Sequence, residues 1–345
     1  MRKLVMAVLI LVVLAVPVSA LDLTAPSAPK EAADLMPGPE ENFGAGVWYI
    51  VKKAAGKLSP DLREAARICL AAGCCGLLLS VFSFLPGGSG STVDLVGTAA
   101  ISLLLLSGTG SMITLAEDTV RQLCAYAKLF FPVLSAALAA QGQVGGSAAL
   151  YGGTMVCTSL LSGIISGILI PLVYVYLVLG IGWSVSSQQI LQKLMDSIRS
   201  VISWGLKMIL YGFMGYMTLT GAIAGAADAT ALKVAKMTIS SVVPVIGGIL
   251  SNASEAVVLS AATVKNAAGV YGFFAFTAMW ISPFLKIGIR YFLLKGTVAV
   301  CSVFGCKKAG PVDCLCSAMG LLLAMTGAVC VMLIVSIACF MKGVG

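Results

Sequence analysis

The chain has 345 residues, of which 59% are hydrophobic and only 10% are charged. Soluble domains contain about 45–50% apolar and about 25% charged residues, so this composition excludes an ordinary soluble protein and indicates an integral membrane protein. The formal net charge is +8. No basic run is interleaved with aromatic residues, so we attribute the excess of Lys and Arg to membrane topology and lipid contact rather than to nucleic-acid binding.

The first 58 residues precede the main apolar part of the chain. Residues 1–20 combine Arg2 and Lys3 with a short apolar run and a small-residue ending, which predicts a signal peptide. An uncleaved first helix is the alternative, and the sequence leaves it open. Residues 21–58 are rich in Pro, Gly and acidic side chains before they become amphipathic. We expect a short, mobile extracytoplasmic segment with at most one surface helix.

Residues 59–345 are expected to form one polytopic transmembrane domain of the all-α class. Ser59-Pro60-Asp61 is a helix-start signal, because Ser caps, Pro suits the first turn and the acid lies near the positive helix end. Six to eight spans are predicted. Their expected ranges are Ile68–Leu85, Leu95–Leu115, Leu123–Ala140, Ala148–Ile168, Ile170–Val185, Trp204–Ala226, Ala267–Leu285 and Ala318–Met341.

Prolines and amphipathic runs complicate this series of spans. Pro132 and Pro171 can kink or split their helices, and Ile170–Val185 is short enough to be one leg of a re-entrant hairpin. The run Gln188–Ser203 has helical apolar spacing, which predicts an interfacial helix that turns into the membrane at Trp204. A second interfacial helix is expected at 287–296.

The densest positive region extends from Lys286 to Lys308, and Asp313 is the one nearby acid in the sequence. The positive-inside rule therefore predicts a cytoplasmic loop there, with the mature N-terminus outside.

Cysteine is frequent, with 11 residues, and histidine is absent. The absence of His excludes any catalytic arrangement built on His. Cys301, Cys306, Cys314 and Cys316 cluster, but their spacings miss the C-x2-C zinc pattern, and most other cysteines lie within apolar runs. We therefore predict no metal site and no cofactor, and interpret the cysteines as small core residues.

Four ionisable residues occur in a Gly- and Ala-rich stretch at apparent membrane depth. They are Asp228, Lys233, Lys236 and Glu255. Between them, "VVPVIGGIL" contains Pro244 and the pair Gly247-Gly248 in a run too short to span. This pattern predicts a broken or re-entrant element between two charged shoulders. A weak similarity at an offset of 27 residues relates Asp228 to Glu255, and it leaves both a structural repeat and chance open.

A charge inside a bilayer costs about 2.5–3.5 kcal/mol, so such residues face a cavity, a partner or the interface. We predict that Asp228 and Glu255 face a shared polar interior or a partner subunit, with Lys233 or Lys236 as counter-charges. The alternative is that these residues mark the aqueous ends of ordinary spans.

This region resembles the stage III sporulation protein AE family of endospore-forming bacteria. The resemblance lies in "AGAADATALKVAK", "VPVIGG" and "SEAVVLSAATVKNAAGVYG", which includes Lys265, Asn266 and Gly269, and it extends over the order of segments in the whole chain. The segment before residue 59 is short for the family, so contacts attributed to it are in doubt. The family has no assigned catalytic residues that could be transferred to this chain.

The resemblance implies a non-enzymatic pore or assembly subunit of a channel-like complex between mother cell and forespore, in the mother-cell membrane around the forespore. It implies partners from the same stage III A operon, namely ring-forming membrane proteins and a cytoplasmic ATPase, and indirectly stage II sporulation protein Q. Self-association is also consistent with it. No Walker motif occurs, so energy would come from another subunit. A secondary transporter for a small solute is the main alternative, favoured by the broken element. An intramembrane enzyme is a weaker one.

Overall fold

The computed structural model describes residues 25–38, 43–83, 90–106, 108–186, 188–242, 247–303 and 310–342. In residues 81–83, 90–95, 221–242 and 247–261 of these ranges it describes the course of the helices but not the side chains. All regular secondary structure in the described ranges is helical, which confirms the all-α class.

The helices follow one another with short connections. Their bounds are α2 Lys30–Ala33, α3 Phe43–Gly56, α4 Ser59–Ser83, α5 Gly90–Leu106, α6 Thr109–Ala140, α7 Val144–Ile164, the π-helix η2 Ile165–Leu169, α8 Ile170–Ser186, α9 Gln189–Val242, α10 Gly247–Val303 and α11 Gly310–Lys342. The start of α4 at Ser59 agrees with the predicted helix start.

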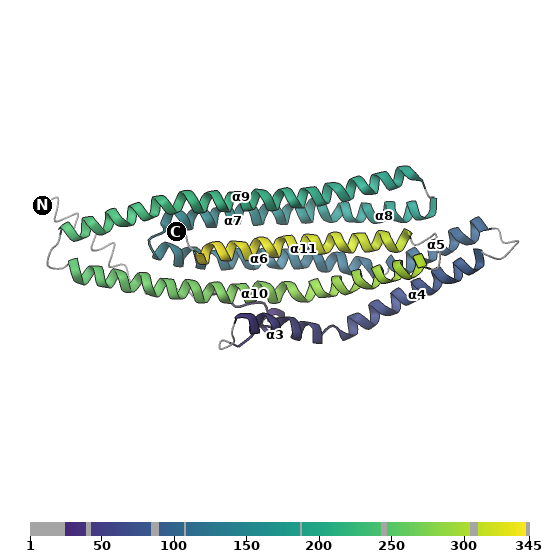
Figure 1. Cartoon of the computed structure of the whole chain (residues 1–345), viewed down its shortest axis with the longest axis horizontal. Coiled ribbons are helices and arrows are strands. Elements are labelled where there is room, and N and C mark those ends of the chain that lie inside the picture. The colour runs from purple at the N-terminus through teal and green to yellow at the C-terminus, as the bar shows by residue number, and fades with distance from the viewer. Residues whose placement is uncertain are drawn as a thin grey trace.

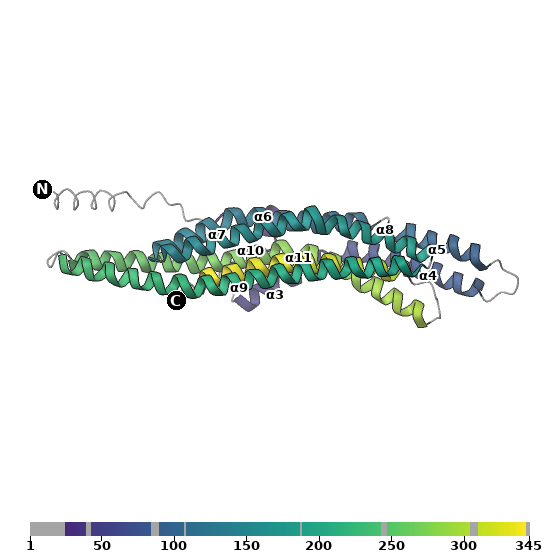
Figure 2. The same cartoon turned by 90° about the horizontal axis from the view of Figure 1, so that it is seen from above.

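The long helices lie side by side in an elongated bundle (Figure 1). α6 and α11 occupy the middle, α7, α8 and α9 cover one side, and α10 with α3 and α4 covers the other. Seen from above, α9 and α10 continue together beyond the ends of α6, α7 and α11 (Figure 2). The middle pair is thus packed between two groups of helices, while the ends of α9 and α10 project.

Aromatic side chains join the three helices of the core. Phe130 and Phe131 of α6 are fully buried, and the Phe131 ring lies 5.5 Å from that of Phe340 on α11. Phe276 of α10 lies 5.8 Å from Phe130 and 5.1 Å from Tyr126, measured between ring centroids. This packing determines which side of α6 faces inward.

Helix α6 corrects the predicted division of the first spans. The sequence predicts one span over Leu95–Leu115 and another over Leu123–Ala140. That prediction is wrong, because α6 is unbroken from Thr109 to Ala140 and the chain breaks earlier, after Leu106. The charges fit inside a helix because they recur on one face at helical spacing.

Pro171 does not split its helix. Proline lacks an N–H, and in an α-helix its ring clashes with the carbonyl four residues earlier. The five residues Ile165–Leu169 form a π-helix just before it, and the N–H of Ile170 donates to the carbonyl of Ile165. This wider turn accommodates the proline, so α7, η2 and α8 form one continuous segment. The two predicted spans on either side of Pro171 are therefore one helix, and a re-entrant leg at Ile170–Val185 is wrong.

Two further boundaries differ from the prediction. α9 is one helix from Gln189 to Val242, so the predicted turn at Trp204 is wrong. The predicted interfacial face of its first part is exposed at Ile190, Leu194 and Val201. The run 287–296 is likewise part of the continuous helix α10 rather than a separate interfacial helix.

Four helical segments of the described chain are long and apolar enough to cross a membrane. They are Val96–Ala140, Val144–Ser186, Ala262–Val303 and Gly310–Lys342. The predicted count of six to eight spans is not confirmed. Each segment has 33–45 residues, more than the roughly 20 helical residues that cross a hydrocarbon core of about 30 Å.

The described part of the N-terminal segment is packed rather than mobile, which corrects the prediction for residues 25–38. Ala32 and Leu35 are buried. The backbone N–H of Ala28 donates to the Tyr271 hydroxyl at 3.1 Å, and the Tyr126 hydroxyl donates to the carbonyl of Pro26 at 2.9 Å. The segment is therefore attached to α6 and α10. Residues 1–20, with the predicted signal peptide, lie outside the described residues.

The close contact of α6 and α10 predicts a position-specific effect of adding one methyl group. A Cβ on Gly272 would overlap the buried ring of Phe130, whereas a Cβ on Gly296 of the same helix meets no atom within 4 Å. Gly272→Ala should lose about 1–3 kcal/mol of stability by overpacking. Gly296→Ala should be neutral or gain up to about 1 kcal/mol from helix propensity. Thermal unfolding of the two purified variants in detergent measures the difference, and equal melting temperatures would contradict this contact.

Candidate functional site

Most of the predicted site residues lie where the side chains are not described. Asp228, Lys233 and Lys236 are on α9, whereas Gly247, Gly248 and Glu255 are on α10. Pro244 lies in 243–246, outside the described residues. α9 ends at Val242 and α10 begins at Gly247, and these two helix ends project together beyond the bundle (Figure 2). The pairing of Asp228 and Glu255 with Lys233 or Lys236 stays a prediction.

Lys265 and Asn266 are the two predicted site residues whose side chains are described. Asn266 is exposed, whereas Lys265 is only 7% exposed. The Lys265 ammonium donates to Oε1 of Gln141 at 3.1 Å, and Gln141 lies at the end of α6 in the turn to α7. The next residue, Gly142, has φ of 87°, a conformation that suits glycine. Lys265 thus ties α10 to the α6–α7 turn.

The Lys265 contact leaves hydrogen-bonding capacity unused within the described part of the chain. An ammonium has three donors, and Gln141 supplies one neutral acceptor. The Gln141 amide nitrogen is itself buried without a hydrogen-bond partner there. Removing the acceptor would leave the buried Lys265 ammonium without a hydrogen-bond partner, which makes this pair sensitive to mutation.

A second site, missed by the sequence interpretation, is a polar face on α6. We call it the α6 polar face. Its residues are Ser111, Thr114, Glu117, Asp118, Arg121, Gln122 and Lys128. All are exposed except Glu117, whose side chain is 27% exposed and accepts a 2.8 Å ion-pair hydrogen bond from Arg121. The spacing 111, 114, 118, 121, 125 and 128 is the signal that could have revealed it.

Contacts between helices give the depth of the α6 polar face. At one end, Arg290 of α10 donates to the carbonyl of Gly108, just before α6. At the other, Tyr126 packs on Phe276 of α10. α10 has no charged residue between Lys265 and Lys286, a stretch of about 20 residues that matches one membrane thickness. The charges of α6 therefore lie beside an uncharged part of α10.

At this depth the surface of α7 is apolar, unlike the α6 polar face. The Cys124 thiol of α6 contacts the carbonyl of Thr158, so this part of α7 lies level with the α6 polar face. Val156 and Leu160 are 58% and 56% exposed there. Large apolar side chains also cover the outside of α9, including Tyr211 and Leu219. These surfaces suit lipid, and the α6 polar face does not.

A basic junction attaches α4 and α5 to α10. Lys286 forms a 3.2 Å ion pair with Asp61 in the first turn of α4, and Arg290 contacts the Gly108 carbonyl beyond α5. The sequence interpretation had placed Lys286–Lys308 in a loop offset by Asp313. That is wrong, because α10 continues to Val303 and Asp61 pairs with Lys286.

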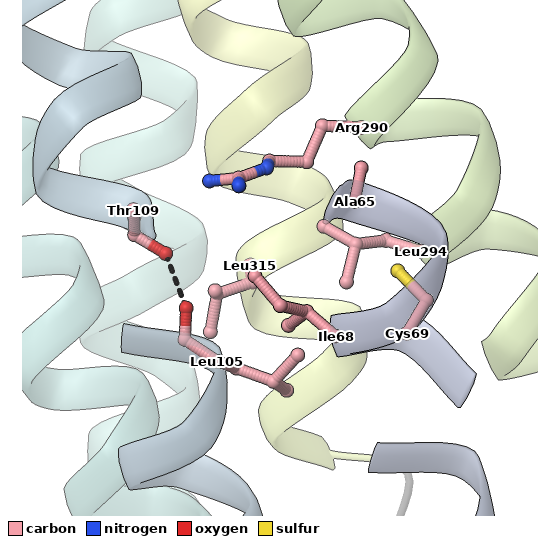
Figure 3. Close-up of a pocket in the computed structure, with 8 residues that line it drawn as sticks. All are labelled: Ala65, Ile68, Cys69, Leu105, Thr109, Arg290, Leu294 and Leu315. Carbon is pink, nitrogen blue, oxygen red and sulfur yellow. Dashed lines mark hydrogen bonds between the residues drawn. The ribbon is translucent and has the colours of Figure 1, made fainter. Parts of the chain in front are cut away.

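A small pocket at this junction is shown in Figure 3, where the Arg290 guanidinium lies above apolar side chains. The lining residues are Ala65, Ile68, Cys69, Leu105, Thr109, Arg290, Leu294 and Leu315. The pocket has room for about one water molecule, so it suits a buried water rather than a substrate.

The clustered cysteines do not converge in the described part of the chain. The Cys314 thiol points to the carbonyl of Tyr176 on α8, and the Cys316 thiol points to that of Tyr291 on α10. Cys306 lies outside the described residues. In the described ranges no group of three or more His, Cys, Asp or Glu residues is placed to hold a metal ion.

The fold and these surfaces define a polytopic helical membrane protein with a charged outer face. The sequence profile of the stage III sporulation protein AE family matches residues 67–343, and the chain belongs to that family. It is 25% identical over 227 residues to stage III sporulation protein AE of Bacillus subtilis (strain 168), a match that covers 64% of this chain and 56% of that relative. No solved structure matches the chain.

The Lys265–Gln141 contact predicts a coupled pair of mutational effects. Gln141→Leu should cost about 1–3 kcal/mol, because it leaves the buried Lys265 ammonium without its acceptor. Adding Lys265→Met should restore most of that loss, since both polar groups are then gone. Asn266→Ala, on an exposed neighbour, serves as the control and should change stability by less than about 0.5 kcal/mol. Unfolding of the parent chain, the single variants Gln141→Leu and Lys265→Met and the double variant in detergent gives the cycle, and additive losses would show that the two side chains do not interact.

Proposed function

We propose that this protein is a non-enzymatic membrane subunit of a sporulation-specific, channel- or export-like complex that links mother cell and forespore. It would act in the mother-cell membrane around the forespore. Membership of the stage III sporulation protein AE family supports a role in sporulation, and four apolar helical segments support a membrane location.

The observation that carries the proposal is the α6 polar face. It exposes Asp118, Arg121 and Lys128 at a depth where α7 exposes Val156 and Leu160. Lipid covers the apolar α7 surface readily, but it covers the α6 polar face only at a high free-energy cost. A chain that leaves such a face open requires water or another protein there, which favours a subunit of an assembly over a protein that works alone.

The partners follow from the family resemblance and belong to the proposal. They are the ring-forming membrane proteins and the cytoplasmic ATPase of the stage III A operon, with stage II sporulation protein Q as an indirect partner. A further copy of this chain is also a candidate. The sequence has no Walker motif, so ATP hydrolysis is assigned to another subunit.

A secondary transporter is the second candidate, and one observation favours it. The sequence between the end of α9 at Val242 and the start of α10 at Gly247 contains Pro244, and ionisable residues occur on both sides of it in sequence. Transporters build substrate sites from interrupted helices. A transporter would complete its substrate path within one chain or one homo-oligomer and would not depend on an ATPase.

Affinity purification from sporulating cells separates the two candidates. A tagged chain, solubilised in mild detergent after engulfment, should co-purify with the ATPase or ring-forming proteins, and its deletion should block sporulation after engulfment. A matched sample from vegetative membranes, with the chain expressed from another promoter, should lack these partners. A chain that purifies alone from sporulating cells and catalyses solute uptake in liposomes would contradict the complex and support the transporter.

A further inference from the structure

The geometry points to a water-filled passage bordered by the α6 polar face, through which hydrophilic solutes of either charge sign could move. The passage would lie outside this chain, between α6 and a neighbouring subunit. This inference rests on the proposed function, because the neighbouring subunit belongs to the complex.

Placing the α6 polar face in lipid would carry a free-energy cost. A charge at bilayer depth costs about 2.5–3.5 kcal/mol. Glu117 and Arg121 reduce this cost by pairing at 2.8 Å, although the Arg121 side chain remains 66% exposed. Asp118 and Lys128 form no ion pair within the described part of the chain. Lys128 could extend toward an interface, whereas the short side chain of Asp118 cannot.

The α6 polar face is long compared with a helix end at a membrane surface. From Ser111 to Lys128 the α6 polar face extends over about 26 Å of helix. A hydrocarbon core is about 30 Å thick, and the contacts Gly108–Arg290, Tyr126–Phe276 and Gln141–Lys265 place the polar surface beside the half of the uncharged α10 stretch that is nearer to Lys286. It is therefore too long to be a single helix end at the membrane surface. A hydrated strip of this length suits a passage.

The composition of the α6 polar face favours contact with water over contact with a protein partner. The cores of protein interfaces are enriched in aromatic residues and Met and depleted in charge. Between Gly110 and Lys128, the exposed residues of α6 include no aromatic, Leu, Ile, Val or Met. They are Gly110, Ser111, Thr114, Asp118, Arg121, Gln122, Ala125 and Lys128. Such a face lacks the anchors of a docking surface, so water is the better match.

The buried side of α6 and the mixed charges of the α6 polar face indicate where the passage runs and which solutes it admits. The opposite face of α6 is filled by buried Val120, Leu123, Phe130 and Leu134, which leaves no path through this part of the bundle. The passage must therefore run along the outside of α6. Its lining has two acids, Glu117 and Asp118, and two bases, Arg121 and Lys128, whereas filters that select by sign use charges of one sign. We therefore expect both cations and anions to reach this face.

Cysteine accessibility in the full chain tests the inference in membranes of the sporulating host. Thr114→Cys, Gln122→Cys and Ala125→Cys are treated with two membrane-impermeant methanethiosulfonates, one cationic and one anionic. Controls are Ala127→Cys, which is buried on α6, and Val156→Cys and Leu160→Cys, which are exposed on α7 at the same depth. Labelling is measured above that of the parent chain and its 11 cysteines, in variants that match the parent in abundance.

Both reagents should modify the three α6 positions at least tenfold faster than the three control positions. Absence of labelling on α6 would overturn the inference, because lipid or protein would then cover the face. Equal labelling of Val156→Cys and Leu160→Cys would also overturn it, because that depth would then lie outside the bilayer. Reaction with one reagent alone would overturn passage of both charge signs. Co-purification is measured separately, so a chain that keeps its partners but has an unreactive α6 refutes the passage and leaves the proposed function standing.

Discussion

The packing of α6 against α10 and α11 is the interaction on which the rest of the structure depends. Tyr126, Phe130 and Phe131 of α6 meet Phe276 of α10 and Phe340 of α11 in one aromatic cluster. Aromatic contacts of this kind contribute beyond the burial of their area and have specific geometry. Once this side of α6 is buried, the helix has no remaining rotational freedom, and its charged residues face outward.

The outward charges in turn restrict what can surround the protein. The α7 and α9 surfaces expose large apolar side chains that lipid can cover, whereas the α6 polar face cannot be covered in that way without a large cost. One bundle therefore presents two incompatible surfaces at the same depth. A subunit placed between lipid on one side and an aqueous assembly on the other satisfies both.

Sequence patterns were sufficient for the features that depend on local composition. The all-helical membrane class and the start of α4 at Ser59 follow from hydrophobicity and helix capping. The continuity of α6 was not predicted, because the apolar runs Leu95–Leu115 and Leu123–Ala140 were interpreted as two separate spans. Whether a charge on a helix faces lipid or water depends on neighbours that are distant in sequence.

Contacts at the candidate site likewise join residues that are too far apart in sequence to be predicted from local patterns. Lys265 was identified from its sequence motif, but its partner Gln141 is 124 residues away, so no local pattern reveals the pair. The ion pair between Lys286 and Asp61 was missed for the same reason. The roles of the residues around Pro244 stay predictions, because the structure does not describe their side chains.

The continuity of α6 is the central claim, and a distance measurement tests it most directly. Spin labels at positions 111 and 128, both exposed, can be measured by pulsed electron spin resonance in the membrane-embedded protein. One unbroken helix separates the two backbone positions by about 26 Å, with a narrow distribution. Two antiparallel spans joined by a turn at residues 116–122 would bring them within about 10–15 Å, since packed helices lie 8–10 Å apart, and would contradict the account.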